Sequence, residues 1–433
     1  MLDRVAGGME FLLTRSIRCM AQIAPIVPLP AITFKSRLEL QGLVRWVAER
    51  SPHYRTKLSE YKIDPRRVRD ISDLSFFTWP EELQRDPESF LCSAANQVFE
   101  TSGTTGRPKR AYFSHREIDE LARYEACALY YFGVRPDDRI LCTFDQGFWV
   151  TGPVTEATFR MLNVFGSMAG KLNPEDALER IIRDRYSVLM ADPTWLLSLT
   201  DACRSAGDAP QLKLIYCGGD RLPEATRRYA ESIWRCPVLQ GYGTTETGGV
   251  LATECFHREG LHVDAFNLIV EIVEPDANGF GELVVTTLNR RVMPLIRYRT
   301  RDVTRFISGP CPCGATVPRI APLQTRRDEM VVMGAGNIYP LLLEKLVDGI
   351  QGWPHSWYAA VRQEGGRDLL EFRVALNGAA SPAELEQKIR DRIRGQQPGM
   401  WANHECHMYR IAVVPSEAPP AQGRKLRRLI DER

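Results

Sequence analysis

The stretch "VFETSGTTGRPKRAYFSH", Val98 to His115, is the most informative in the chain because it crowds small hydroxyl residues and glycines together just before a lysine. A loop this poor in bulky side chains adds little to a core. Its backbone N–H groups and hydroxyls can instead surround phosphate oxygens, and glycine lets the backbone approach closely. It lacks the Walker pattern. The stretch predicts a nucleotide phosphate loop, with a glycine-rich surface turn as the alternative. The predicted loop comprises Thr101, Ser102, Gly103, Thr104, Thr105, Gly106 and Lys109.

The composition is that of a globular protein. The chain has 433 residues, of which 44% are hydrophobic and 25% charged, enough for a sizeable core. A formal net charge of +2 gives no field that favours nucleic acid or an anionic membrane. No apolar run reaches the ~20 residues that span a bilayer, and the N-terminal segment predicts a terminal helix or arm rather than a targeting signal. Eleven mostly scattered cysteines suit reduced thiols. We expect a cytoplasmic protein.

Strand and helix patterns alternate in the middle of the chain. "RILCTF", "YSVLMADPTWLLSLTDAC", "LKLIYCGGDRLPEATRRYAESI" and "CPVLQGYGTTETGG" predict strands that end in turns, most of them followed by a helix. This order predicts parallel strands with ligands at their carboxyl ends. Upstream, "SRLELQGLVRWVAERSPHYRTKL" predicts a helix, and Pro80 predicts the start of a short one.

The residue pattern changes after about residue 255. "FNLIVEIVEPDANGFGELVV" is rich in residues that favour strands, with a turn at "PDANGFGE". From Arg326 the pattern is helix, strand, helix, strand, which predicts a small α+β lobe. We therefore expect two domains, an ATP- and acyl-binding domain over residues 1–327 and a small C-terminal lobe over residues 328–433.

A second turn resembles the first in composition. "YGTTETGG", Tyr242 to Gly249, follows a predicted strand, and its Glu246 offers the kind of carboxylate that holds Mg²⁺ beside substrate phosphates. In "IRYRTRDV", Asp302 is a hydrogen-bond acceptor suited to ribose hydroxyls. Together the segments predict a nucleotide site built from several strand ends.

These segments resemble the adenylate-forming superfamily of acyl-CoA synthetases, peptide-synthetase adenylation domains and luciferases, and most of all its phenylacetate-CoA ligase branch. The resemblance covers the chain from about residue 40 to its end. It implies an α/β fold, with a large N-terminal lobe of layered parallel sheets and helices, a β-rich subdomain and a small mobile α+β C-terminal lobe. It is carried by "SPHYRTKL", "FETSGTTGRPK", "YCGGDRLPEATRRYAE", "YGTTETGG", "RYRTRDVTRF", "CPCG", "RRDEMVVMGAGNIYP" and "GRKLRRLID", in that branch's order.

The resemblance implies an AMP-forming acid–thiol ligase. Such an enzyme uses ATP and Mg²⁺ to convert an aryl acid to an adenylate, and then forms a thioester with CoA. One alternative is an aryl-AMP ligase that loads the phosphopantetheine of a carrier protein in secondary metabolism. An alternative of another class is a non-catalytic acyl-nucleotide binding protein. The choice among aryl acids stays open, and related enzymes are often dimers.

The resemblance also implies residue roles. Thr245 would contact the α-phosphate, Glu246 would ligate Mg²⁺, and Lys425 would touch both carboxylate and α-phosphate. Arg424 and Arg427 are alternatives to Lys425, and a solvated basic tail is the other interpretation. Asp328 matches the hinge residue. The implied nucleotide contacts beyond the phosphate loop are Gly218, Gly219, Asp220, Tyr242, Gly243, Thr244, Asp302 and Arg326.

The acyl pocket is expected in an aromatic, glycine-rich region around "TFDQGFWVTGP" and the second turn. A flat pocket for a ring would use such residues, although ordinary core packing is the alternative. The candidate lining residues are Tyr131, Phe132, Phe148, Trp149, Gly152, Gly241, Thr247 and Gly248.

Four residues form a candidate structural zinc site. Cys311 and Cys313 stand in "CPC", and Cys255 and His262 lie in "ECFHREGLH". Three thiolates and one imidazole make a closed tetrahedral set of the kind that binds structural Zn²⁺. His257 is an alternative to His262, and free thiols are the alternative to a metal site. A second cluster, "HECH" near residue 405, is interpreted as surface or strand residues rather than a metal site.

Overall fold

The computed structural model describes residues 16–101, 108–144, 146–170, 172–207, 209–324, 331–334, 336–364, 367–376, 380–416, 421–422, 425–426 and 428–433. Two compact units divide the chain. The larger unit extends to Leu222 and continues over Ala230–Thr300 and Thr304–Pro322, and the smaller unit comprises Pro223–Tyr229, Arg301–Val303 and Leu323–Arg433. The predicted boundary between residues 327 and 328 lies outside the described residues and stays a prediction.

Helices dominate the N-terminal part of the larger unit. The helix expected over "SRLELQGLVRWVAERSPHYRTKL" is two helices, because Ser51 has extended backbone before Pro52 and its side chain caps the second helix. Pro80 begins a short helix as predicted. The elements are α2 (Ile17–Ile23), η1 (Ala24–Ile26), α3 (Leu29–Arg50), α4 (Pro52–Glu60), η2 (Ile71–Asp73), α5 (Pro80–Arg85) and η3 (Pro87–Phe90).

No single helix among the described residues is long and apolar enough to cross a membrane. The segments Ile17–Ile26 and Leu29–Arg50 pass the length and composition criteria only as a pair bent by 108°.

A nine-stranded sheet forms the centre of the larger unit. Its order is β13-β14-β9-β8-β7-β6-β5-β3-β4. The strands from β4 to β7 pair in parallel, as the alternating pattern predicted, and those from β7 to β13 pair antiparallel. The strands are β3 (Arg139–Cys142), β4 (Phe165–Met168), β5 (Val188–Ala191), β6 (Leu214–Cys217), β7 (Val238–Thr244), β8 (Gly249–Glu254), β9 (Leu261–Val263), β13 (Phe306–Ile307) and β14 (Arg319–Ile320).

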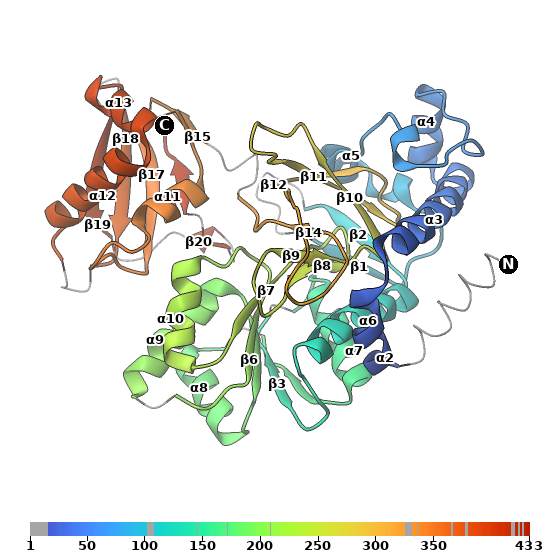
Figure 1. The fold of residues 1–433 in the computed structure, drawn as a ribbon, viewed down its shortest axis with the longest axis horizontal. Coiled ribbons are helices and arrows are strands. Elements are labelled where there is room, and N and C mark those ends of the chain that lie inside the picture. The colour runs from blue at the N-terminus through green and yellow to red at the C-terminus, as the bar shows by residue number, and fades with distance from the viewer. Residues whose placement is uncertain are drawn as a thin grey trace. The chain divides into compact units, whose positions relative to one another are not determined.

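Helices cover both faces of the parallel part (Figure 1). Successive strand residues point to opposite faces, so Leu214 and Tyr216 pack in one apolar layer while Ile215 and Cys217 pack in the other. The first layer lies under α6 (His115–Tyr131) and α7 (Thr151–Leu162), and the second under α8 (Pro174–Arg183) and α9 (Pro193–Ala206), with α10 (Glu224–Trp234) beside them. This three-layer arrangement leaves the carboxyl ends of the strands as the place for a site.

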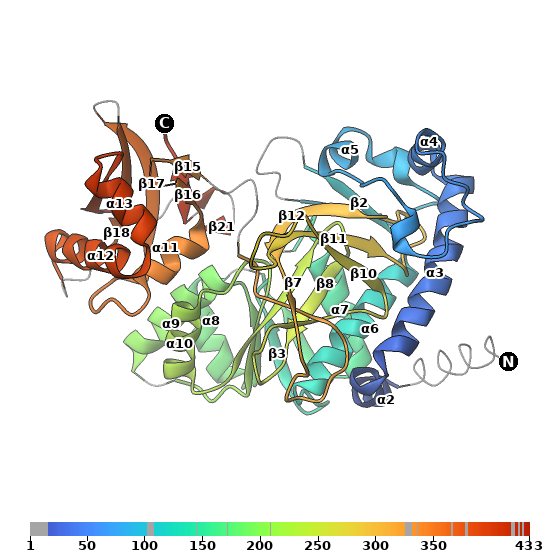
Figure 2. The ribbon, with the colours of Figure 1, turned by 45° about the horizontal axis from the view of Figure 1, so that its top comes forward.

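Two smaller β elements lie beside the central sheet. β1 (Gln97–Glu100) and β2 (Arg110–Phe113) form an antiparallel hairpin, and β10 (Leu268–Val273), β11 (Gly281–Thr287) and β12 (Tyr298–Thr304) form a three-stranded sheet. Figures 1 and 2 both show β2 near this sheet. The turn predicted at "PDANGFGE" joins β10 to β11, which confirms the β-rich segment.

The smaller unit is an α+β layer. Its four-stranded sheet has the order β19-β18-β17-β22, with a separate β15–β16 hairpin. Apolar residues of the sheet and of the three helices form one core. The elements are β15 (Val331–Met333), β16 (Gly336–Ile338), α11 (Pro340–Val347), β17 (Trp357–Glu364), β18 (Arg367–Val374), α12 (Pro382–Gln396), α13 (Pro398–Glu405), β19 (Tyr409–Pro415), β20 (Ala421–Gln422), β21 (Lys425–Leu426) and β22 (Leu429–Asp431).

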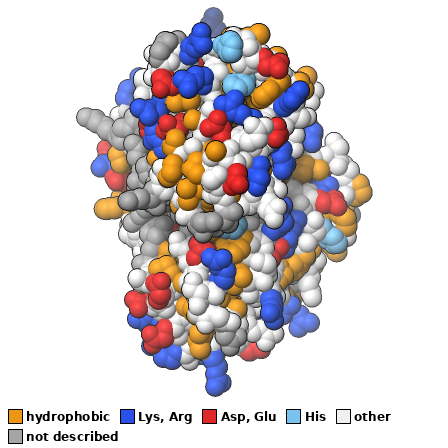
Figure 3. Space-filling view, turned by 90° about the vertical axis from the view of Figure 1, so that its left-hand side faces the viewer, with side chains coloured by type: hydrophobic (Ala, Val, Ile, Leu, Met, Phe, Trp, Pro, Cys, Tyr) orange, Lys and Arg blue, Asp and Glu red, His pale blue; other side chains and the backbone are white. Residues whose placement is uncertain are grey.

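Basic and acidic side chains are interspersed on the face drawn in Figure 3. This distribution agrees with the near-neutral formal charge of +2.

Candidate active site

The predicted phosphate loop joins the two strands of the β1–β2 hairpin. The Thr101 N–H donates to the Lys109 carbonyl at 3.0 Å, and the Lys109 N–H donates to the Thr101 hydroxyl at 3.2 Å. These bonds fix where the loop leaves and rejoins the hairpin. Ser102, Gly103, Thr104, Thr105 and Gly106 lie outside the described residues.

The second glycine-rich turn follows β7 and requires its glycines. A Cβ on Gly243 would lie 1.7 Å from the carbonyl oxygen of Gly249, so the two strands approach too closely for any side chain there. Gly248 has a φ of +99°, which favours glycine. The Thr247 N–H donates to the Thr244 hydroxyl at 3.3 Å. This tight turn holds Thr245 and Glu246 in buried positions.

Three side chains meet where the two turns come together. The Lys109 ammonium lies 2.5 Å from Glu246 Oε1, and the Tyr298 hydroxyl donates to the same oxygen at 3.0 Å. The Lys109 ammonium also lies 3.3 Å from the Tyr298 hydroxyl. The hairpin, the turn after β7 and β12 therefore converge on one carboxylate.

Glu246 is held ionised despite its burial. Burial alone would raise the pKa of this carboxyl, but the nearby Lys109 ammonium, followed by the Tyr298 hydroxyl, outweighs it and lowers the pKa below the ordinary value. A buried carboxylate kept charged at neutral pH is chemically suited to a divalent cation.

A buried arginine, Arg290, holds the backbone of the same turn in place. The Arg290 guanidinium donates to the carbonyl of Glu246 at 3.2 Å and to the carbonyl of Tyr112 at 2.7 Å, and it stacks over the ring of Phe113. The Glu117 carboxylate lies 3.5 Å from its Nε. Arg290 thus ties β2, which follows the phosphate loop, to the backbone that carries Glu246.

The adenine- and ribose-binding residues predicted from the resemblance lie on or beside strand ends. Gly219, with φ +82°, follows β6, and the carbonyl of Asp220 accepts from the Gln240 side-chain amide at 3.3 Å. Gly218 lies between Cys217 of β6 and Gly219, and Tyr242 is buried on β7. Asp302 is buried on β12, four residues after Tyr298. Their roles as nucleotide contacts stay predictions.

Three predicted residues of the smaller lobe cannot be placed in detail. Arg326 and Asp328 lie outside the described residues. Lys425 begins the short strand β21, and its side chain is outside the description. Its catalytic role and the hinge role of Asp328 stay predictions.

The predicted acyl-pocket residues do not form one group. Phe132 is buried in the layer under α6, with its ring 6.0 Å from that of Tyr216. Phe148 is 65% exposed, while its carbonyl accepts from the Glu100 N–H at 2.9 Å, beside the start of the phosphate loop. Tyr131 instead lies against Cys313, where burial and then this thiol raise its pKa to about 12. The role of Tyr131 in an acyl pocket stays a prediction.

A cavity of about 680 Å³ lies along α7 and β4. Gly152 contributes to its lining, as do Gln146 and Gly147 of the aromatic segment, whereas Thr247, Gly248 and Gly241 do not. Lys109, Glu246 and Tyr298 are also absent from the lining. The cavity is therefore separate from the cluster around Glu246.

Comparisons with known proteins agree with this arrangement. The family model described as AMP-binding enzyme matches residues 87–287, which include the phosphate-loop segment and the turn that carries Glu246. The phenylacetate-coenzyme A ligase of Thermus thermophilus is 27% identical over 430 residues, covering 91% of this chain and 95% of the relative. The chain is therefore similar to enzymes of this kind. It lies in the phenylacetate-CoA ligase-like branch of the adenylate-forming superfamily, and the enzyme of that name from Escherichia coli is 28% identical over 82% of this chain and 88% of its own length.

Solved structures show the same fold as this chain. A 2-hydroxyisobutyryl-CoA ligase, solved in its postadenylation state with 2-HIB-AMP, superposes with a TM-score of 0.82 at 18% identity, covering 95% of this chain and 91% of the other. This likeness confirms the predicted α/β architecture with its smaller α+β unit.

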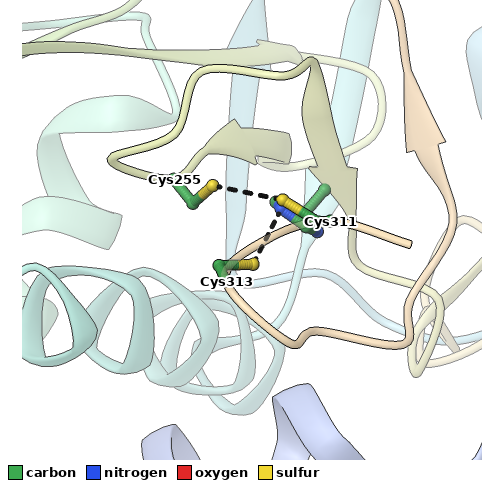
Figure 4. A group of neighbouring side chains, drawn as sticks. Cys255, Cys311 and Cys313 are labelled. Carbon is green, nitrogen blue, oxygen red and sulfur yellow. Dashed lines mark hydrogen bonds between the residues drawn. The ribbon is translucent and has the colours of Figure 1, made fainter. Parts of the chain in front are cut away.

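The candidate zinc residues come together in the larger unit. The ligand atoms of Cys255, His262, Cys311 and Cys313 all lie within 4.8 Å of one another, and Figure 4 shows the three cysteines pointing toward a common centre. Cys255 Sγ lies 3.6 Å from Cys311 Sγ, and Cys313 Sγ lies 3.5 Å from His262 Nε2. His257 is exposed and is not in the group.

The "HECH" segment forms no such group among the described residues. The His404 imidazole contacts the Arg390 guanidinium at 2.6 Å and the Tyr409 carbonyl at 3.2 Å. Cys406 and His407 are exposed. The segment therefore lies at the end of α13 and in the exposed turn after it, which fits the expected surface residues and not the expected strand.

Two residues of the site, Tyr298 and Arg290, were not predicted from the sequence. Tyr298 stands in the quoted "IRYRTRDV", and strand alternation places it on the same face of β12 as Asp302, which was a usable signal. Arg290 and its partner Glu117 are 173 positions apart, so no local pattern joins them. The capping box formed by Ser114 and Glu117 predicts only the start of α6.

Proposed function

We propose that this chain is an AMP-forming aryl-CoA ligase. A carboxylate oxygen of an aromatic acid attacks the α-phosphorus of ATP, and the bond to pyrophosphate breaks. The sulfur of CoA then attacks the acyl carbon, AMP leaves with the bridging oxygen, and the thiol proton passes to solvent. The convergence of Lys109 and Tyr298 on Glu246, between two glycine-rich turns, carries this proposal. The names of the relatives support the acid–CoA ligase class.

The chain's own residues suit a reaction between two anions. The Lys109 ammonium supplies a positive charge where the phosphate loop rejoins its hairpin. Glu246, held ionised by this ammonium, would hold Mg²⁺ together with the nucleotide phosphates. When bound, Mg²⁺ neutralises phosphate charge and so lowers the barrier to attack by a carboxylate. Lys425 is proposed to approach the same reacting groups during adenylation.

An aromatic acid is proposed over a fatty acid because aromatic side chains lie at the carboxyl end of β6 and against β7. Phe144 lies 3.4 Å from the Cβ position of Gly218, and Tyr216 lies against Gly241. Both glycines therefore pack closely against these aromatic side chains, and aromatic faces favour stacking with a ring. The assay described below tests both the identity of the acid and CoA as the thiol acceptor. The eleven free cysteines support a cytoplasmic location as part of the proposal.

We also propose that Cys255, His262, Cys311 and Cys313 bind a structural Zn²⁺. Tetrahedral zinc with bonds of about 2.3 Å to sulfur and 2.0–2.1 Å to nitrogen separates two sulfurs by roughly 3.8 Å and a sulfur from a nitrogen by roughly 3.5 Å. The distances of 3.6 and 3.5 Å fit this geometry. With four protein ligands the site is closed, so its proposed role is to join the residue 255–262 segment to the residue 311–313 segment.

The function is tested by incubating the purified chain with ATP, Mg²⁺, CoA and a panel of aryl, fatty and amino acids. We expect AMP and an aryl-CoA thioester in equal amounts. Activity confined to fatty or amino acids would overturn the substrate class. Aryl adenylate without transfer to CoA, but with transfer to a carrier protein, would overturn the proposed thiol acceptor.

A further inference from the structure

Two of the three groups that meet at Glu246 are held in place by the backbone around them. The turn that carries Glu246 is fixed by the Arg290 guanidinium, which donates to the Glu246 carbonyl at 3.2 Å. Tyr298 is 1% exposed, and the carbonyl before it and the N–H after it bond to the backbone of Thr78 at 2.9 and 3.0 Å. The carboxylate and the tyrosine hydroxyl therefore have fixed positions.

The third group, the Lys109 ammonium, can move. Lys109 stands where the phosphate loop rejoins its hairpin, and its backbone is fixed there by two hydrogen bonds with Thr101. A flexible hydrocarbon stem joins the ammonium to that backbone, and the side chain is 17% exposed. Rotation about the bonds of the stem can therefore carry the charge away from Glu246 without disturbing the hairpin.

The ammonium occupies the place where a metal ion would bind the carboxylate. It lies 2.5 Å from Glu246 Oε1, the oxygen that also accepts from the Tyr298 hydroxyl at 3.0 Å. Mg²⁺ requires oxygen ligands at about 2.0–2.1 Å, so an ion on this oxygen would lie within about 5 Å of the ammonium nitrogen. Like charges this close repel each other in a partly buried site. An ammonium on Glu246 therefore disfavours a metal ion there.

We propose that Lys109 holds the cation position of Glu246 until ATP binds, and that ATP binding exchanges the partners. The inference rests on the proposed function of Glu246 as a ligand of Mg²⁺. When nucleotide phosphates lie beside the hairpin, Lys109 leaves the carboxylate and pairs with phosphate oxygens, which are strong acceptors for an ammonium. Glu246 then accepts the metal ion, while Tyr298 keeps its hydrogen bond to Oε1. Every charge has a partner before and after this exchange.

The exchange couples the binding of the metal ion to the binding of the nucleotide. Without phosphates, Lys109 has no comparable partner to move to, so Glu246 binds a divalent cation weakly. With phosphates present, the ammonium is paired elsewhere and the carboxylate is free for the ion. Coupling between two ligands typically changes an affinity by roughly 5- to 150-fold, and the effect is reciprocal. The ion pair also keeps the two glycine-rich turns joined before ATP binds.

The test measures binding of Mn²⁺, a paramagnetic probe for a Mg²⁺ site, to the full chain without nucleotide by electron paramagnetic resonance. The wild type should bind Mn²⁺ weakly. Lys109→Met removes the competing charge and should bind it roughly 5- to 150-fold more tightly. Lys109→Arg keeps a positive charge and should bind as weakly as the wild type. Lys213→Met is the matched control, because it neutralises a lysine that pairs with Asp138 outside this cluster, and it should keep the wild-type affinity.

A second set of measurements assigns the gain in affinity to Glu246. The double variant Lys109→Met, Glu246→Gln should lose the gain. Mg²⁺ alone should raise the unfolding temperature of Lys109→Met and not that of the wild type, because a ligand stabilises the folded state that binds it. If Lys109→Met does not fold, Lys109→Gln provides the same comparison, since its neutral amide can donate to the carboxylate.

The outcomes separate this inference from the proposed function. Equal Mn²⁺ affinity in the wild type and in the neutral variants, or a gain that persists with Glu246→Gln, would overturn the exchange of partners. These measurements require neither an acid nor turnover. A wild-type protein that activates no aryl acid would overturn the proposed function, whereas the Mn²⁺ comparison would still decide the role of Lys109.

Discussion

The Lys109 ammonium and the Glu246 carboxylate lie 2.5 Å apart, with 17% and 6% of their side chains exposed. Each charge stabilises the other, because burying an ion without a partner costs free energy. The same carboxylate oxygen also accepts from Tyr298. The pair therefore links the phosphate-loop hairpin to the turn after β7 and stabilises both.

Lys109→Met should destabilise the fold by about 3 kcal/mol, since it leaves the Glu246 charge buried and unpaired. The double variant Lys109→Met, Glu246→Gln should recover most of this loss. The measurement is urea unfolding of the wild type, both single variants and the double variant. Lys213→Met is the control, because Lys213 pairs with Asp138 at 2.7 Å but is 42% exposed, so its loss should cost about 1 kcal/mol or less. Additive single effects would contradict the coupling.

A lysine at position 290 should not be able to take over the contacts of the native arginine. A guanidinium reaches the carbonyls of Glu246 and Tyr112 and the Glu117 carboxylate at once, whereas an ammonium cannot match this planar set of donors. We expect about 3 kcal/mol or more of lost stability from the buried pair. We also expect a higher Mg²⁺ concentration for half-maximal exchange, because the turn that carries Glu246 loses its anchor. Unfolding curves and a Mg²⁺ titration measure the two effects, and Arg291→Lys, at an exposed loop position, is the comparison. An unchanged Mg²⁺ requirement in a folded Arg290→Lys protein would refute the anchoring role.

Stability should fall as the pH rises through the range in which Glu125 ionises. Burial raises the pKa of this carboxyl from 4.5 to about 7, opposed by the Thr155 hydrogen bond. Between these values the unfolded chain releases the proton while the folded chain retains it, so rising pH favours unfolding, and the loss levels off above pH 7. The difference corresponds to about 3 kcal/mol.

Glu125→Gln should remove this part of the pH dependence. Asp264 is a second buried acid, whose pKa burial raises to about 6, so Asp264→Asn should remove a separate part and leave the Glu125 contribution in place. Free energies of unfolding between pH 5 and 8 measure both. A Glu125→Gln curve parallel to that of the wild type would contradict the assignment.

Removing the proposed zinc should lower the stability of the larger unit. We expect about one Zn²⁺ per chain by elemental analysis, a lower unfolding temperature after chelation, and the loss of zinc in Cys313→Ser. Cys236→Ser changes a buried thiol outside the cluster and should retain the metal. Zinc-free wild-type protein with unchanged stability in added Zn²⁺ would overturn the proposed site.

Local patterns were sufficient to predict most of the fold. The alternation from β3 to β7, the turn between β10 and β11 and the α+β pattern of the smaller unit all follow from residue periodicity. The break at Ser51–Pro52 was missed because the apolar spacing continues across it, although a proline restricts the residue before it.

The site was predicted where residues are close in sequence and missed where they are not. Glu246 and Lys109 each stand in a recognisable turn, but their direct contact joins positions on different elements. The buried arginine at position 290 and the carboxyl at position 125 carry no local motif, since their importance arises from burial and from partners brought together by the tertiary fold. Tyr131 was assigned to an acyl pocket from its aromatic neighbours, and its contact with Cys313 could not be foreseen from periodicity.

The decisive measurement is ATP–pyrophosphate exchange driven by an aromatic acid, compared between the wild type and Glu246→Gln. We predict exchange that requires the acid and Mg²⁺ and that falls by roughly 10²–10³-fold in the variant, the scale for loss of one preorganised electrostatic group. Tyr112→Phe, which loses a long contact to Glu88 and a hydrogen bond with Arg110 and leaves the Tyr112 carbonyl in place, should retain wild-type exchange. Exchange at the wild-type rate in folded Glu246→Gln, or no exchange with any aromatic acid, would contradict the proposed function of this site.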